Sequence, residues 1–184
     1  MKFLLTAINA KFIHSNPAIY SLRAGVGEKL QPYVELAEFT INESLESILE
    51  GIWKRQPKVI GFSCYIWNWK LIREILTELP KILPDTEIWL GGPEVTYDGP
   101  GLLSEFPQVT GIMVGEGEVT FREVLEQYLR EAETAGQSEQ QPESDSTEHQ
   151  VADRRGTVAG KSMVERFGQI PGLCLASGYT APRD

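Results

Sequence analysis

Two short glycine-rich segments carry the residue types best suited to binding a ligand. Residues 91–94 read Gly-Gly-Pro-Glu, and residues 115–118 read Gly-Glu-Gly-Glu. Glycine lets a ligand approach the backbone closely, and amides at 115–118 could receive a polar group where a helix begins. Each segment also has a purely structural interpretation, since a Gly-Gly pair suits a tight turn and Glu118 suits the first turn of a helix. Because they fall on adjacent loops, the two segments together predict a ligand site.

Two further loops hold polar and aromatic side chains. His14 lies in the loop 9–16 and could bind a metal or a ligand, with an ordinary loop histidine as the structural alternative. Residues 65–69 form an aromatic cluster that suits a large planar ligand or a partner domain, or else packs on the core. Ser63 offers a hydroxyl to a ligand or caps a turn. Cys64 is interpreted as a small buried residue, because no histidine or other base is paired with it.

Missing motifs exclude several enzyme classes. The chain has no GxGxxG after its first apolar run, no GxxxxGK[ST] and no GxSxG. These absences argue against the usual dinucleotide fold, the P-loop and the hydrolase elbow. A phosphoacceptor receiver domain needs acids after its first and third strands, where this chain has Asn9 and Ser63-Cys64.

The pattern of apolar residues predicts the elements that position these loops. Short apolar runs alternate with segments of helical periodicity, and Asn16-Pro17 is typical of a helix start. We expect strands at 3–8, 34–40, 59–63, 88–90 and 111–114. The alternation predicts an α/β fold, a doubly wound, flavodoxin-like five-stranded parallel sheet with helices on both faces. Ligands of such sheets bind at the carboxyl ends of the strands, where the candidate loops lie.

Composition and charge limit the partners. The 184 residues carry a formal net charge of -9, which disfavours binding to nucleic acid phosphates. No apolar run approaches the ~20 residues of a membrane span, and Asn9 and Lys11 interrupt the N-terminal run too early for a signal peptide. The two cysteines, Cys64 and Cys174, do not form a disulfide framework. We therefore expect a cytoplasmic protein that binds neither nucleic acid nor membrane.

The C-terminal third differs in composition. Residues 133–161 are rich in Glu, Gln, Ser and Thr and poor in large apolar residues, which predicts a disordered acidic linker. Residues 162–184 contain the strand-like run Ile170 to Gly178. The predicted organisation is a ligand-binding domain at 1–132, the linker at 133–161 and a lead-in to a further domain at 162–184.

The order of these motifs resembles a known family. A strand is followed by Asn-Ala-Lys-Phe-Ile-His-Ser-Asn-Pro at 9–17, Val-Ile-Gly-Phe-Ser at 59–63, Gly-Gly-Pro-Glu-Val at 91–95 and Gly-Glu-Gly-Glu at 115–118. It resembles the N-terminal cobalamin-binding domain of cobalamin-dependent radical SAM proteins, the class of the magnesium-protoporphyrin monomethyl ester oxidative cyclase and of various methyltransferases. The resemblance covers roughly residues 1–130.

The resemblance implies cobalamin as the cofactor and the strand-end loops as its site. The implied cofactor-binding residues are Asn9, Lys11, His14, Ser63, Cys64, Tyr65, Gly91, Gly92, Pro93, Glu94, Gly115, Glu116 and Gly117. The corrin would lie on the rim, and its nucleotide tail would pass between strands and helices, where the Gly-Gly pair leaves room. A side chain at Gly92 is therefore expected to block the tail without unfolding the domain.

Two departures from related proteins refine this picture. Cobalamin domains of the methionine synthase kind carry Asp-x-His-x-x-Gly in the first loop, whereas this chain has Phe12 two residues before His14. We therefore assign no metal ligand, and His14 is the one candidate for cobalt. The family's iron–sulfur cluster needs CxxxCxxC, and this chain has two separate cysteines. The S-adenosylmethionine and 4Fe-4S sites are therefore expected in a C-terminal radical SAM barrel of the same, longer polypeptide.

Two alternatives remain open at this point. In one, the rim docks a partner domain without any cofactor. In the other, the domain binds a flavin or a nucleotide. The resemblance favours a non-catalytic cobalamin module that presents the corrin to a methyltransferase or cyclase barrel.

Overall fold

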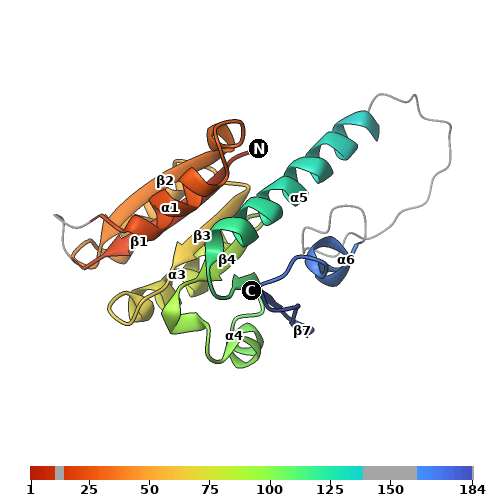
Figure 1. Ribbon diagram of the computed structural model, residues 1–184. Coiled ribbons are helices and arrows are strands. Elements are labelled where there is room, and N and C mark those ends of the chain that lie inside the picture. The colour runs from red at the N-terminus through yellow and green to blue at the C-terminus, as the bar shows by residue number, and fades with distance from the viewer. Residues whose placement is uncertain (11–14, 139–160, 184) are drawn as a thin grey trace, which may run out of the picture.

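A single seven-stranded sheet forms the centre of the molecule (Figure 1). The computed structural model describes residues 1–10, 15–138 and 161–183. The strands, with their bounds, are β1 (Phe3–Asn9), β2 (Val34–Thr40), β3 (Val59–Ser63), β4 (Glu87–Gly91), β5 (Val109–Met113), β6 (Leu173–Leu175) and β7 (Gly178–Tyr179). They lie in the order β2-β1-β3-β4-β5-β6-β7, and the first five run parallel. The predicted doubly wound α/β fold and its five parallel strands are confirmed.

Helices cover both faces of the sheet, as predicted. They are α1 (Pro17–Gly25), α2 (Leu45–Trp53), α3 (Trp69–Ile82), α4 (Gly99–Glu105), α5 (Gly117–Ser138) and α6 (Met163–Phe167), with short 3₁₀ turns η1 (Gln31–Tyr33) and η2 (Pro93–Val95). One face packs against α1 and α5, and the opposite face packs against α2, α3 and α4. Figure 1 shows α1 and α5 on the same side of the sheet.

Local sequence explains where these helices begin. Asn16 caps α1 by accepting a hydrogen bond from the Ala18 amide at 2.9 Å, and Pro17 follows at the first helical position. Ser44 caps α2 by accepting from the Ser47 amide. The predicted start of α1 is therefore confirmed, and each cap satisfies an amide that has no partner inside its helix.

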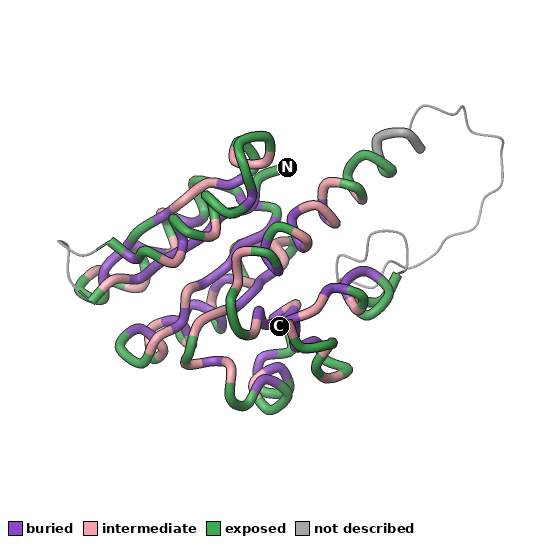
Figure 2. The backbone as a smooth tube through the Cα atoms, in the orientation of Figure 1, coloured by how far each residue is buried: buried purple, intermediate pink, exposed green. Residues whose placement is uncertain are grey.

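Burial follows the parallel strands. Every residue from Phe3 to Ile8 is buried, because helices cover both faces of β1. Figure 2 shows the buried positions running along the sheet and exposed positions on the outer sides of the helices. Two hydrophobic clusters result, one on each face of the sheet.

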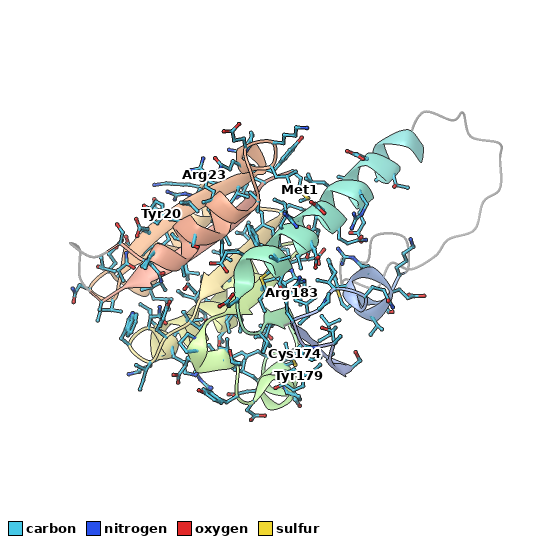
Figure 3. The ribbon with its side chains drawn as sticks, in the orientation of Figure 1. Met1, Tyr20, Arg23, Cys174, Tyr179 and Arg183 are labelled. Carbon is cyan, nitrogen blue, oxygen red and sulfur yellow. The ribbon has the colours of Figure 1, made fainter. Side chains whose placement is uncertain are left out.

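The C-terminal segment joins the sheet instead of standing apart from it. β6 pairs antiparallel with β5, and β7 pairs antiparallel with β6, which the sequence analysis did not predict. Figure 3 labels Cys174, Tyr179 and Arg183 on this segment. The Tyr179 hydroxyl accepts from the Gly99 amide of α4 at 3.3 Å, and the Arg183 Nε donates to Thr120 of α5 at 2.9 Å. The predicted three-part domain division stays a prediction.

The last predicted helix of the sheet is longer than expected. α5 continues to Ser138, so residues 133–138, which were assigned to the linker, are helical. The remainder of the predicted linker, residues 139–160, lies outside the described residues. Figure 1 shows α5 extending well beyond the sheet. None of the helices in the described ranges is long and apolar enough to cross a membrane.

Candidate functional site

A cavity of about 660 Å³ lies between the sheet and the helices α1 and α5. It reaches the carboxyl ends of β3, β4 and β5. The sheet and its loops contribute Phe3, Leu5, Gly61, Phe62, Ser63, Tyr65, Trp89, Leu90, Gly91, Gly92, Pro93, Thr96, Tyr97, Met113, Gly115 and Glu116, and the helices contribute Ala18, Ile19, Leu22, Gly117 and Glu118. The volume is in the range of ligand sites in proteins.

The inner part of the cavity is apolar and is floored by the sheet. Phe3, Leu5, Trp89 and Met113 belong to one buried hydrophobic cluster on this face. Gly61 lies between Leu5 and Trp89 in the strand register, where it presents no side chain. The floor therefore suits a flat apolar group that enters between the strands and the helices.

Gly91 and Gly92 have different roles. Gly91 pairs with Met113, and a Cβ atom at Gly91 would meet only ordinary contacts, at 3.7 Å from the Met113 oxygen and 3.8 Å from its Cβ. Gly92 has a φ of 106°, and a Cβ atom there would lie 2.4 Å from the Cys64 carbonyl oxygen. A side chain at Gly92 would thus strain the turn itself. That such a side chain blocks the tail without unfolding the domain stays a prediction. Gly91 is the position that controls space in the cavity.

Asn68 joins the carboxyl ends of β1 and β3 by hydrogen bonds of its side chain. Its buried side chain donates from Nδ2 to the carbonyl oxygens of Ile8 and Ser63, each at 3.0 Å, and its Oδ1 accepts from the Tyr65 amide at 2.8 Å. Every hydrogen-bonding position of this amide but one is used. The loop after β3 is therefore held rigidly at the cavity mouth. The sequence analysis missed Asn68, although an Asn directly before a helical segment is a recognisable start signal.

The Ser63 hydroxyl is part of the same framework. It accepts from Nδ2 of Asn16 at 3.1 Å, which joins the end of β3 to the start of α1. Glu38 in β2 accepts from the Asn9 side chain, the Asn16 amide and the Tyr20 hydroxyl. Burial alone would raise the pKa of Glu38, but these hydrogen bonds outweigh burial and lower it. Asn9 thus faces Glu38 and does not line the cavity.

Acidic side chains stand at the start of α5, beside the cavity mouth. Glu116 and Glu118 line it, and the Ser21 hydroxyl of α1 donates to Glu118 at 2.7 Å. This hydrogen bond lowers the pKa of Glu118, so the carboxylate is charged near neutral pH. No lysine or arginine occurs among the described lining residues. The mouth therefore disfavours strongly anionic ligands.

Aromatic side chains project around the opening. The rings of Tyr65 and Trp67 stack with centroids 4.4 Å apart. Tyr97 is 90% exposed and Ile66 is 79% exposed, so both lie largely in solvent. Trp69, in contrast, packs edge-on against Phe106, the residue that follows α4. Of the predicted aromatic cluster, Tyr65 to Trp67 lie at the rim and Trp69 contacts the core.

The structure brings most of the predicted site residues to one cavity. Those that line it are Ser63, Tyr65, Gly91, Gly92, Pro93, Gly115, Glu116 and Gly117. Asn9, Cys64 and Glu94 lie nearby outside the lining, and Lys11 and His14 lie outside the described residues. The sequence analysis missed the apolar floor, because its residues read as ordinary core positions of strands. The binding role of each residue stays a prediction.

Cys64 is buried in the core next to the turn formed by Gly91 and Gly92. Its amide donates to the Gly91 oxygen at 2.7 Å, and its side chain is completely buried. Burial raises the pKa of the Cys64 thiol, and it also raises the pKa of Cys174. Neither thiol is therefore an effective nucleophile near neutral pH.

We expect iodoacetamide to leave both cysteines unmodified in the folded protein at mildly alkaline pH, because the reactive thiolate is absent and the sulfur atoms are buried. Both cysteines should react once guanidinium chloride unfolds the chain, which serves as the control. Mass spectrometry of tryptic peptides measures each site. Rapid labelling of Cys64 in the folded protein would contradict the closed packing of this strand end.

Comparisons with known proteins identify the family to which this fold belongs. The profile of the family described as "B12 binding domain" matches residues 4–125. The cobalamin-dependent radical SAM methyltransferase TokK of Streptomyces tokunonensis is 37% identical over 71 residues, covering 38% of this chain and 10% of TokK. A 2-(S-pantetheinyl)-carbapenam-3-carboxylate methyltransferase of Streptantibioticus cattleyicolor is 34% identical over 88 residues, covering 47% of this chain and 12% of that protein. The matched segments thus span about a tenth of these relatives.

Solved structures share the fold. The cobalamin-dependent S-adenosylmethionine radical enzyme OxsB, with aqua-cobalamin and S-adenosylmethionine bound, matches 98% of this chain and 22% of its own at a TM-score of 0.61 and 15% identity. The radical S-adenosylmethionine methyltransferase TsrM from Kitasatospora setae matches 98% of this chain and 30% of its own at a TM-score of 0.58 and 17% identity. The family profile covers well over half of the sequence, including every described strand-end loop of the cavity. The chain belongs to the B12-binding domain family.

Proposed function

We propose that this chain binds cobalamin with the nucleotide tail in the cavity between the sheet and the helices α1 and α5, and with the corrin over the rim. The observation that carries this proposal is the position of the cavity, which opens at the carboxyl ends of β3, β4 and β5 in a B12-binding domain. A cavity beside an exposed rim suits cobalamin, which has a flat corrin ring and a long nucleotide tail.

The residues at the cavity fit such a ligand. The apolar floor of Phe3, Trp89 and Met113 offers contact to the aromatic base of the tail. Gly91 leaves the end of β4 bare where the tail would pass, since a Cβ atom there would meet only ordinary contacts. The amides at the start of α5 and the Thr96 hydroxyl offer hydrogen bonds to the polar groups between base and ring.

The rim residues would orient the ring. The stacked Tyr65 and Trp67 and the exposed Tyr97 offer flat apolar surface beside the opening. Bound cobalamin supplies the cobalt chemistry, and the chain positions and shields it. His14 is the predicted candidate for a cobalt ligand and lies outside the described residues.

We further propose that the corrin is presented to a radical SAM domain that transfers methyl groups. The support is the similarity to TokK and to the carbapenam methyltransferase, together with the fold shared with OxsB and TsrM. In this proposal the exposed rim is the surface that faces the second domain. The reaction on the substrate would take place in that second domain.

Equilibrium dialysis with hydroxocobalamin, FMN and NAD in parallel tests the cofactor. We expect hydroxocobalamin to be retained and the other two to be excluded, because Glu116 and Glu118 at the mouth repel their more highly charged phosphates. Retention of FMN or NAD alone would support the flavin or nucleotide alternative. Retention of none would favour the cofactor-free docking domain and contradict the proposal.

A further inference from the structure

A chain of buried hydrogen bonds runs from the cavity floor to the last helix. The Trp89 Nε1 donates to the Tyr128 hydroxyl at 2.8 Å, and Tyr128 donates in turn to Glu87 at 2.7 Å. Arg166 of α6 donates to both carboxylate oxygens of Glu87, at 3.0 and 3.1 Å, and also binds Glu131 of α5. The donors converge on Glu87, which accepts from Tyr128 on one side and from Arg166 on the other.

This network is enclosed by protein. The side chain of Arg166 is completely buried, and those of Glu87 and Glu131 are 11% and 12% exposed. Burial, followed by the charge of Glu87, raises the pKa of Tyr128 well above its ordinary value. The phenol therefore stays protonated and keeps its donor for Glu87 and its acceptor for Trp89.

The hydrogen bond to Tyr128 decides where the indole lies. The strand register places Trp89 between Gly61 on β3 and Gly111 on β5. A Cβ atom at Gly111 would lie 2.7 Å from Cζ3 of Trp89, whereas the atoms closest to a Cβ atom at Gly61 belong to Phe3 and Leu5. The indole thus lies over Gly111, and the Phe3 and Leu5 side chains that cover Gly61 line the cavity.

The last helix adds a second restraint. Phe167 of α6 packs edge-on against Trp89 with centroids 5.1 Å apart. Arg166 from the same helix lies over the rings of Tyr128 and Phe167 at 5.2 and 4.7 Å. Both α6 residues lie outside the part of the chain that matches the B12-binding family profile, which ends at residue 125.

We propose that Tyr128 is a positioning residue for the ligand, because it holds the Trp89 indole over Gly111 and so keeps it out of the cavity that would receive the nucleotide tail. The helix α6 completes this restraint through Phe167 and Arg166. The inference rests on the proposed placement of the tail in the cavity. Without the hydrogen bond, other staggered side-chain conformations of Trp89 become accessible, and those that turn away from Gly111 into the cavity take the space of the tail.

The test compares two ligands and three proteins. Affinities are measured for hydroxocobalamin and for aquocobinamide, a corrin that lacks the nucleotide tail, in the parent chain, in Tyr128→Phe and in Glu131→Gln. Tyr128→Phe removes only the hydroxyl that holds Trp89. Glu131→Gln is the matched control, because it alters the same network at Arg166 but leaves Trp89, Tyr128 and Glu87 bonded to one another.

We expect the parent to prefer hydroxocobalamin over aquocobinamide. Tyr128→Phe should lower the affinity for hydroxocobalamin about tenfold and leave the affinity for aquocobinamide unchanged, and Glu131→Gln should keep the parent's preference. A purely structural role of Tyr128 would lower both affinities together. Trp89→Phe removes the indole that Tyr128 holds but leaves Tyr128 bonded to Glu87, so adding Tyr128→Phe to this variant should lower the affinity for hydroxocobalamin no further.

The outcomes separate this inference from the proposed function. If the parent binds neither corrin, or binds both equally, the placement of the tail is overturned and the role of Tyr128 with it. If the parent discriminates between the two corrins and Tyr128→Phe either keeps that preference or lowers it as much in the Trp89→Phe background as in the parent, the positioning role alone is overturned.

Discussion

A Gly91→Leu variant is expected to keep the fold and to lose cobalamin. Gly91 faces the cavity from the end of β4, and a Cβ atom there meets only ordinary contacts with Met113. The remaining leucine atoms extend into the cavity, where the apolar floor accommodates them in place of the ligand. We expect the affinity for hydroxocobalamin to fall about a hundredfold, which corresponds to roughly 2.7 kcal/mol. Equilibrium dialysis measures the affinity, and thermal unfolding measures the fold.

The adjacent glycine provides the control. Gly92→Ala adds a single methyl group, but it lies 2.4 Å from the Cys64 oxygen and the backbone has a φ of 106°. Backbone strain of this kind costs about 1–3 kcal/mol, so Gly92→Ala should lower the thermal midpoint where Gly91→Leu does not. A Gly91→Leu protein that is folded and binds hydroxocobalamin as tightly as the parent would remove the cavity from the binding site.

An Arg166→Met variant is expected to lose about 3–5 kcal/mol of unfolding free energy, because it leaves the carboxylates of Glu87 and Glu131 buried without their cation. That loss is a large part of the ~5–15 kcal/mol that stabilises a typical domain. Chemical denaturation, followed by circular dichroism, measures the change. Forming a buried ion pair contributes little net stability, because both charges lose their hydration. Removing one partner is costly, because the other charge stays buried without a partner.

The matched control for Arg166 lies on the surface. Arg73 also binds a glutamate, Glu105, with two nitrogen atoms and also lies over two aromatic rings. Its side chain is 42% exposed, so solvent screens the pair and Arg73→Met should change the unfolding free energy by less than about 1 kcal/mol. Equal losses in the two variants would show that burial does not set the strength of the Arg166 network.

Local sequence was enough to predict the elements and the class of the fold. Each parallel strand reads as a short apolar run, and Asn16-Pro17 marks a helix start, because these signals depend only on neighbouring residues. Parallel strands then require helical crossovers, so the alternation implies a doubly wound sheet. The resemblance of the loops at 91–95 and 115–118 pointed to cobalamin, and the family match at residues 4–125 supports it.

The sequence could not show which glycine of the pair has room for a side chain on the cavity side. Gly91 and Gly92 are neighbours of the same type, but a Cβ atom at one would face the cavity and at the other would meet Cys64. The choice depends on the strand register and on the turn that follows, both of which involve residues far apart in the chain. For the same reason Asn68 was missed, since its partners Ile8 and Ser63 come from two different strands.

By itself, the sequence determined the alternation of strands and helices, the loops at their ends and the family they resemble, because these are patterns of adjacent residues. Only the tertiary structure decided that the segment beginning at residue 161 returns to the sheet and places Arg166 beside Glu87. An ion pair between residues 79 positions apart has no local signal, and its members read as ordinary surface charges. The shape of the cavity depends on the same long-range contacts, since Trp89 lies where Tyr128 and Phe167 hold it.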